Sequence, residues 1–440
     1  MLSSFIRRYS VLLASAAIVV LIGLTLACGS YSKHFVGGIA NFSTTVFVGD
    51  SLTAGFQNGS LLDTQQPNGW APLVAKQANF KITLPLIAPP GAPAVLKLVS
   101  VGPPPVVQQA SGTTSGRDNP TEQPTDLAVP GHTVHDLLNY GPTLGTSSED
   151  IITDLVLAFP LGNTNTQAQE AVALKPTALF IWIGNNDALP AIESGMPSSM
   201  TDLASFTADF TALMQGAHSQ TNAMLIVGNI PDVTQVAYLT PAATVLAEAA
   251  TQSGLSTAQL SAILGITNGD FVNATGLGEV QTDLQKLAAS QPTTPLDDAG
   301  VLTAAEVVQV QTQVAAYNSV IATQARAVNG IVVDINGLFA SLQPGITINN
   351  YTATTAYLGG LFSLDGIHPT NTGYALVANK FIDTMNSALG LSIADVDVAT
   401  IAASDPLFGP NIKPGAATVR QRIPLVAAKS ADVVMRGRAR

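Results

Sequence analysis

Four short, apolar runs rich in β-branched residues constrain the fold of this chain more than any other feature. They cover residues 44–49, 178–184, 224–228 and 331–335. Each run is almost continuously apolar rather than alternating, which is typical of strands in a parallel sheet that helices cover on both faces. The sequence therefore predicts a buried parallel sheet built from these runs.

Helical patterns lie between the runs. Two sets of apolar residues recur at steps of three and four, one before the third run and one before the fourth: Leu203, Phe206, Phe210 and Leu213, and Val310, Val314, Tyr317 and Ile321. These steps place each set on one face of a helix. Residues 371–389 predict a closing helix capped near Asn371 or Thr372. Alternating strands and helices predict a doubly wound α/β fold.

Length, composition and charge exclude several classes of protein. The 440 residues exceed a minimal doubly wound domain, so insertions or a second domain are expected. Hydrophobic residues make up 47% of the chain and charged residues 11%, which excludes a disordered protein. The net charge of −11 argues against a nucleic-acid partner, and the single cysteine excludes a disulfide framework or a cysteine-rich metal site.

Three segments do not fit the minimal α/β pattern. Residues 81–126 are rich in proline and predict an irregular insertion with one strand near residues 95–101. Residues 236–302 predict several short helices broken by glycine, which form either a lid or wall of a substrate cleft or a packing embellishment. Residues 391–440 predict a basic C-terminal tail, either solvated or in contact with anionic lipid.

The first residues of the chain are typical of an export signal. Arg7 and Arg8 precede an apolar run over residues 11–26, which is somewhat short for a comfortable membrane span. Residues 24–28, Leu-Thr-Leu-Ala-Cys, resemble the bacterial lipobox, in which the cysteine is acylated and becomes the new N-terminus.

The lipobox resemblance implies a signal peptide over residues 1–27, a lipid anchor on Cys28 and a tether over residues 28–41. Acyl chains on Cys28 would hold the exported protein at the cell envelope, as an outer-membrane lipoprotein facing the periplasm or the exterior. The alternatives are an ordinary signal peptide with a stray cysteine, or an uncleaved anchor.

A serine follows the first predicted strand directly. Ser51 stands in Gly-Asp-Ser-Leu, at the carboxyl edge of the sheet, where open α/β folds bind their ligands. At the start of a helix its backbone N–H would face a developing oxyanion. The simpler interpretation is that Ser51 or Asp50 only caps the helix.

A serine nucleophile needs a base, and His368 has the most suitable context of the five histidines. Asp365 precedes it by three residues in Asp-Gly-Ile-His-Pro, close enough on a tight loop to orient the imidazole. His34 lies near the tether, and His218 ends a helix of surface character. For any of these histidines, a satisfied polar or surface side chain is the alternative.

Two further segments offer oxyanion donors. Asn186 follows the second predicted strand in Gly-Asn-Asn-Asp, and Gly131 lies on a Val-Pro-Gly turn where no Cβ obstructs its N–H. Read alone, Gly-Asn-Asn-Asp is simply a turn. His132 and His135 follow Gly131 and are expected to line the cleft or the surface. No third ligand supports a metal site at this spacing, so no metal or cofactor is predicted.

Taken in this order, the four segments resemble the blocks of the SGNH, or GDSL-type, hydrolase family. The matching segments are residues 49–52, 126–131, 184–187 and 365–369. The resemblance covers residues 42–390, with both insertions between blocks, and implies a three-layer α/β/α sandwich with a five-stranded parallel sheet. One residue departs from the family pattern: the second block often begins with asparagine, whereas this chain has Asp126.

The resemblance also implies a role for each candidate residue. Ser51 is the nucleophile, His368 the general base and Asp365 the group that orients it. The N–H of Ser51, the N–H of Gly131 and the side chain of Asn186 form the oxyanion hole. Together with the lipobox resemblance, the family resemblance implies an exported, membrane-tethered serine esterase or lipase acting on small-molecule or lipid esters. A carbohydrate O-acetyl esterase of the cell envelope is the alternative enzyme, and a non-catalytic surface lipoprotein with this fold is a further alternative.

Overall fold

Residues 40–101 and 105–412 are described by the structure, which is a computed structural model. The predicted signal peptide over residues 1–27, the predicted acylation site Cys28 and the chain beyond residue 412 lie outside these described residues. Among the described helices, none is long and apolar enough to span a membrane.

Four parallel strands form the central sheet, in the order β1-β4-β5-β9. They are β1 (Thr45–Gly49), β4 (Ala178–Trp182), β5 (Met224–Gly228) and β9 (Ile331–Val333), one in each predicted run. Val46 pairs with Leu179, which pairs in turn with Leu225. The residues of β1 and β4 are all buried, because helices cover both faces of the sheet. The predicted parallel α/β fold is confirmed.

The edge beside β1 is occupied by residues 125–129 rather than by a regular strand. Phe47 and Asp126 form an isolated parallel bridge. The N–H of Val129 continues the pairing by donating to the carbonyl of Gly49 at 3.1 Å. The five-stranded sheet that the family resemblance implies is therefore built from four strands and one irregular edge segment.

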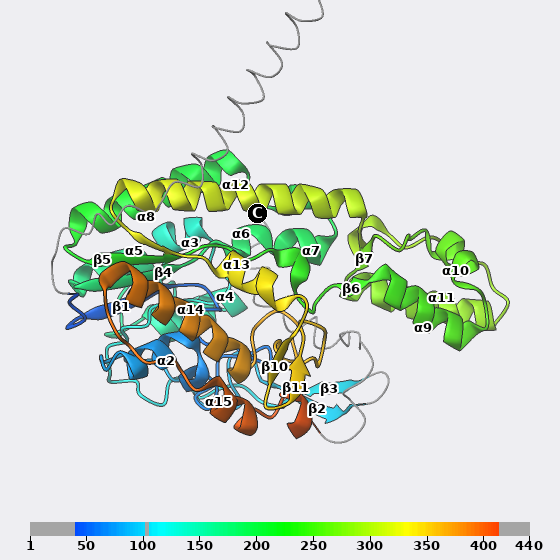
Figure 1. Ribbon diagram of the computed structural model, residues 1–440, viewed down its shortest axis with the longest axis horizontal. Helices are drawn as coiled ribbons and strands as arrows, with labels where there is room; N and C mark the ends of the chain where they lie inside the picture. Colours follow the sequence, from blue (N-terminus) through cyan, green and yellow to red (C-terminus); the bar gives the residue numbers. More distant parts are fainter. Residues whose placement is uncertain (1–39, 102–104, 413–440) are drawn as a thin grey trace, which may run out of the picture. The chain divides into compact units, whose positions relative to one another are not determined.

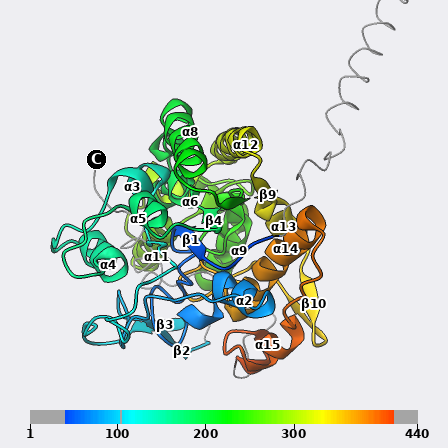
Figure 2. The ribbon, with the colours of Figure 1, turned by 90° about the vertical axis from the view of Figure 1, so that its left-hand side faces the viewer.

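Helices form a layer on each face of the sheet (Figures 1 and 2). On one face α8 (Leu203–Gln220) packs against α12 (Ala304–Ala327), and on the other α2 (Trp70–Gln77) packs against α14 (Asn371–Leu389). The predicted apolar face of α12 is fully buried, whereas Leu203, in the first turn of α8, is exposed. The arrangement is a three-layer α/β/α sandwich.

An aromatic cluster joins the sheet to the α2–α14 layer. The ring of Phe180 on β4 stacks on that of Phe47 on β1 with centroids 4.6 Å apart. The ring of Trp70 on α2 stacks on that of Phe381 on α14 with centroids 3.9 Å apart. All four side chains are fully buried, so packing between the rings adds to the hydrophobic stabilisation.

Both predicted insertions contain small antiparallel sheets. In residues 81–126, β2 (Leu96–Ser100) pairs with β3 (Val106–Gln109), and the sequence predicts only the first of these strands. Residues 236–302 form a sheet of three two-residue strands, β6 (Thr240–Pro241), β7 (Phe271–Val272) and β8 (Val301–Leu302). They also form three α-helices, which lie beside one another in Figure 1: α9 (Ala242–Ser253), α10 (Thr257–Leu264) and α11 (Ala274–Ala288). A two-residue strand has no readable period, so the sequence cannot predict it.

The remaining elements are short. They are α3 (Val134–Asn139), α4 (Ser148–Leu157), α5 (Gln167–Ala173), α6 (Asn185–Ala188), α7 (Pro190–Ser194), α13 (Ile335–Leu342), the hairpin β10 (Ile346–Ile348) and β11 (Tyr351–Ala353), and α15 (Val398–Ser404). The predicted cap of α14 is wrong by one residue, because Thr370 Oγ1 accepts the N–H of Gly373 at 3.1 Å. α15 packs against α14, so ordered structure continues beyond residue 390.

Candidate active site

Ser51 lies immediately after β1, at the carboxyl edge of the sheet. The strand ends at Gly49, where an added Cβ would lie 2.3 Å from the backbone oxygen of Trp182, so no larger residue fits there. Ser51 is buried, and its Oγ lies 2.7 Å from Nε2 of His368. This distance allows the imidazole to take the hydroxyl proton.

Asp365 approaches the other side of the imidazole. Its Oδ2 lies 3.1 Å from Nδ1 of His368, an ion-pair distance rather than a well-aligned hydrogen bond. Its Oδ1 accepts the backbone N–H of Ile367 and of His368, each at 2.9 Å. The loop can turn this tightly because Gly366 has a φ of 76°, in the left-handed region that favours glycine.

Burial and charge act in opposite directions on Asp365. Burial alone would raise its pKa, but the positive charge of the neighbouring His368 and hydrogen bonds from that loop hold the pKa below its ordinary value. Asp365 therefore remains ionised, as a group that stabilises an imidazolium must.

A loop that follows the nucleophile supports Asp365, although no motif in the sequence indicates it. The N–H of Gly59 donates to Oδ2 of Asp365 at 2.7 Å, between residues 306 apart in the chain. The ring of Phe56 packs on the imidazole of His368 with centroids 4.6 Å apart. These contacts fix both the carboxylate and the ring plane of the base.

The predicted oxyanion donors lie in neighbouring loops. Gly131 has a φ of 88°, which favours glycine at this turn. Nδ2 of Asn186 donates to the carbonyl of His132 at 2.9 Å, and the second hydrogen of that amide remains for a ligand. Within residues 40–101 and 105–412, no hydrogen bond uses the backbone N–H of Ser51 or of Gly131. All three groups can therefore donate to a substrate oxygen.

Asp50 connects the nucleophile to the Asn186 loop. Its Oδ2 accepts Nδ2 of Asn185 at 2.8 Å, and its Oδ1 accepts the N–H of Leu52 at 3.1 Å. Burial raises the pKa of Asp50 to about 6, although both hydrogen bonds act in the opposite direction. The contact with Leu52 closes a turn: residues 51–55 form turns, so the helix that the sequence predicts to start at Ser51 is wrong. The contact with Asn185 joins the ends of two strands.

The sequence predicts that His132 lines the cleft or the surface, but the structure shows that its side chain is fully buried. Its Nδ1 lies 3.0 Å from Nε2 of Gln167, and its Nε2 lies 3.1 Å from Oγ1 of Thr153. Gln167 also accepts the N–H of Gly49 at 3.0 Å. The prediction is wrong because the partners of the ring lie on α4 and α5, 21 and 35 residues further along the chain.

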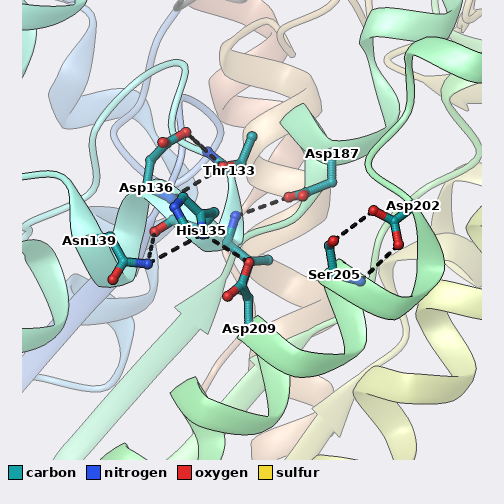
Figure 3. Close-up of polar contacts among 9 residues, drawn as sticks. Thr133, His135, Asp136, Asn139, Asp187, Asp202, Ser205 and Asp209 are labelled. Carbon is teal, nitrogen blue, oxygen red and sulfur yellow. Dashed lines mark hydrogen bonds and ion pairs between the residues drawn. The ribbon is translucent and has the colours of Figure 1, made fainter. Parts of the chain in front are cut away.

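His135 lies on α3 and points toward α8 (Figure 3). Its Nδ1 lies 3.1 Å from Oδ2 of Asp209 at the surface. In the same view Asp187 accepts the N–H of Val134 at 3.0 Å, which holds the loop of Asn186 against α3. In the part of the chain that the structure describes, no group of three or more His, Cys, Asp or Glu side chains is arranged to hold a metal ion.

Asp126 is a second buried carboxyl near this edge of the sheet. Its Oδ1 accepts the N–H of Ala128 at 3.2 Å, whereas its Oδ2 has no partner among the described residues. Burial raises the pKa of Asp126 to about 8. At neutral pH this carboxyl is therefore mostly protonated, and it resembles the asparagine that often begins this block of the family.

The sequence matches the model of one protein family, GDSL-like lipase/acylhydrolase, over residues 45–381. The chain belongs to this family. No curated protein is similar enough in sequence to count as a match. The family match and the parallel sheet together make this protein a GDSL-type hydrolase by descent and by fold.

Solved structures show distant similarity. One is LAE5, an alpha/beta hydrolase enzyme from the metagenome of Lake Arreo, Spain, with 14% identity, a TM-score of 0.37, and coverage of 80% of this chain and 99% of that chain. A protein from Parabacteroides merdae ATCC 43184, described as a GDSL-like lipase, has 12% identity, a TM-score of 0.39, and coverage of 81% and 99%. Axe2, an acetylxylan esterase from Geobacillus stearothermophilus, has 13% identity, a TM-score of 0.37, and coverage of 81% and 99%. Similarity this distant says nothing about the substrate of this chain.

We expect Asn186→Ala to lower kcat by roughly a hundredfold or more, because the variant loses one oxyanion donor. KM should change little, since the bond strengthens as charge develops on the substrate oxygen. Steady-state kinetics on an activated ester measure both constants. An unchanged kcat would mean that the oxyanion is bound elsewhere.

We expect Asp126→Asn to stabilise the fold by an amount that grows with pH. The pKa of Asp126 rises from 3.8 to about 8 on folding, so its contribution to stability is full below pH 3.8 and is lost as the pH rises through 8. The asparagine side chain does not ionise in this pH range, so the variant does not lose stability in this way. Urea unfolding of both proteins at several pH values gives the difference in unfolding free energy, and a difference independent of pH would contradict the expectation.

Proposed function

We propose that this GDSL-family hydrolase is a serine esterase or lipase that cleaves carboxylic esters through an acyl-enzyme on Ser51. One observation carries the proposal: Oγ of Ser51 lies 2.7 Å from Nε2 of His368, whose Nδ1 lies 3.1 Å from Asp365. A merely structural serine would not need a base that is itself oriented by a buried carboxylate.

In the first half of the reaction, Oγ of Ser51 attacks the ester carbonyl while its proton passes to Nε2 of His368. The carbonyl oxygen becomes an oxyanion, which accepts hydrogen bonds from the N–H groups of Ser51 and Gly131 and from the amide of Asn186. His368 then returns the proton to the leaving alcohol, the C–O bond of the ester breaks, and the acyl group remains on Ser51.

In the second half, water attacks the acyl-enzyme. His368 takes one proton from that water, and the tetrahedral intermediate collapses to the free carboxylic acid as the proton returns to Oγ of Ser51. Asp365 stays ionised throughout and stabilises the imidazolium in both halves, in keeping with its lowered pKa.

A cavity of about 520 Å³ lies beside the loop that carries Asp365 and His368, and we take it as the site for part of the substrate. Two of its lining segments form hydrogen bonds with the loop of Asp365 and His368. Tyr357, which lines the cavity, donates its OH to the carbonyl of Leu364 at 2.9 Å. Tyr238, next to the lining residue Ala237, donates its N–H to the carbonyl of Gly366 at 2.8 Å. Its lining contains no charged side chain. The cavity therefore favours a neutral ester over one with a charged group at this position.

Hydroxyl and amide side chains make up much of the same lining, and this favours a carbohydrate O-acetyl ester as the second candidate substrate. They come from the turn before the helical insertion, the insertion itself, α12, the end of α13, and β11 with the loop after it: Thr234, Gln235, Thr240, Thr244, Gln311, Gln343, Thr352, Thr354 and Thr355. Sugar hydroxyls can bond to such groups, whereas a long acyl chain would leave them unsatisfied. The leading candidates are thus simple alkyl or acyl-lipid esters and acetylated carbohydrates.

We also propose that the enzyme is exported and tethered to the cell envelope through a lipid on Cys28. The support is the sequence alone: a basic pair, an apolar run and Leu-Thr-Leu-Ala-Cys at residues 24–28. An anchored enzyme would meet its ester at or near a membrane, as a lipid or as an envelope polysaccharide.

We expect Ser51→Ala to reduce turnover of p-nitrophenyl esters by roughly 10⁴-fold or more, because no other group can form the acyl-enzyme. Ser43→Ala, at an exposed serine before β1, is the matched control and should retain full activity. A series from acetyl to long-chain esters would separate acetyl-ester preference from lipid preference. Turnover that survives Ser51→Ala would refute the mechanism.

We expect Cys28→Ala to move the protein from the membrane fraction to the soluble fraction of the envelope, because the only cysteine that can be acylated is removed. Fractionation and immunoblotting of cells expressing each form measure the shift. If the variant stays with the membrane, an uncleaved apolar anchor holds the protein instead.

A further inference from the structure

A buried histidine outside the predicted triad connects the nucleophile to the oxyanion loop. His132 is fully buried and contacts α5 through Gln167 and α4 through Thr153. Gln167 is fully buried as well, and its Oε1 accepts the N–H of Gly49, two residues before Ser51. The contacts therefore connect the end of β1 to the imidazole of His132, the residue that follows Gly131.

We call the contacts from Gly49 through Gln167 and His132 to Thr153 the relay. The direction of each hydrogen bond in the relay follows from the N–H of Gly49. The N–H of Gly49 can only donate, so the Gln167 atom that faces it must be Oε1. The amide nitrogen of Gln167 then faces Nδ1 of His132, which must accept and therefore has no proton. In a neutral imidazole the proton lies on Nε2, where it donates to Oγ1 of Thr153.

The opposite arrangements each place two donors face to face. A proton on Nδ1 of His132, in either the charged ring or the other neutral tautomer, would face the amide hydrogens of Gln167. Rotating that amide would instead turn its hydrogens toward the N–H of Gly49. Because all of these groups are buried, water cannot relieve either conflict.

The backbone of His132 is bonded to the oxyanion hole itself. Its carbonyl accepts Nδ2 of Asn186 at 2.9 Å, and its N–H donates to the carbonyl of Val129 at 3.3 Å, which closes the turn around Gly131. Two of the three expected oxyanion donors are thus attached to this one residue. A shift of the ring would move both donors relative to Ser51.

We propose that His132 is a positioning residue, fixed as the neutral Nε2–H tautomer, that holds Gly131 and Asn186 in register with Ser51 through Gln167. It touches neither substrate nor reacting atoms. Its effect on the reaction rests on the proposed esterase function, whereas its tautomer does not.

The tautomer is measured by ¹⁵N NMR of the full-length chain labelled at its five histidines, with the His132 signals assigned from their absence in His132→Phe. We expect a protonated Nε2 and an unprotonated Nδ1 from about pH 5.5 to pH 8. Gln167→Glu, whose carboxylate can accept from both Gly49 and Nδ1, should move the proton to Nδ1. A protonated Nδ1 in the wild type, or no change in Gln167→Glu, would overturn the proposal.

Kinetics test the positioning role. We expect His132→Phe, which retains an aromatic ring but neither nitrogen, to lower kcat by about tenfold to a hundredfold with KM within about twofold, because oxyanion stabilisation is impaired and substrate binding is not. His135→Phe is the matched control: this histidine lies three residues later, is half exposed and should leave kcat unchanged. Affinity for an alkyl boronic acid, which forms a tetrahedral adduct on Ser51, should fall by the same factor as kcat/KM.

A double-mutant cycle separates this relay from general damage to the fold. His132→Phe and Gln167→Leu should act through one path, so the double variant should lose no more kcat than the worse single variant. The relay would be overturned if the loss of kcat in the double variant equalled the product of the two single losses. It would also be overturned if His132→Phe had the same kcat as the wild type. If Ser51→Ala is itself still active, the proposed esterase function fails, and the tautomer measurement continues to test the relay independently.

Discussion

Parallel strand pairing is the constraint on which the active site depends. Because all four strands run in one direction, their carboxyl ends lie at a single edge of the sheet, and each delivers a loop there. β1 lies between β4 and the edge segment of residues 125–129, so Ser51 emerges between Asn186 on one side and Gly131 on the other. The strand order thereby places the Ser51 hydroxyl between the loops of Asn186 and Gly131.

Burial gives the site its rigidity. Asp365, His368, Asp50 and His132 are all withdrawn from solvent, and a buried polar group without partners would cost the fold free energy. Their partners come from separate segments: Gly59 for Asp365, and Asn185 for Asp50. Each bond therefore fixes the distance between two loops, which a substrate site requires to within fractions of an ångström.

One of the two insertions, residues 236–302, borders the cavity beside the loop of Asp365 and His368. The cavity beside the catalytic loop is walled by the stem of the helical insertion and by the β10–β11 region, both of which bond to residues 364–366. The segments that wall this cavity all lie outside the four blocks that carry the family resemblance. Differences in substrate between family members can arise in such walls without any change in the triad.

The sequence by itself determined the four strands, the long helices and the order of the four blocks, because apolar periodicity and glycine-containing turns are local properties of the chain. It also placed Ser51, Gly131, Asn186, Asp365 and His368 at loops expected to converge at one sheet edge. Only the tertiary structure decided the burial of His132, the relay through Gln167, the support of Asp365 by Gly59 and the protonated state of Asp126. Each of these depends on partners many residues away or on the exclusion of water, and neither is encoded in the spacing of residues along the chain.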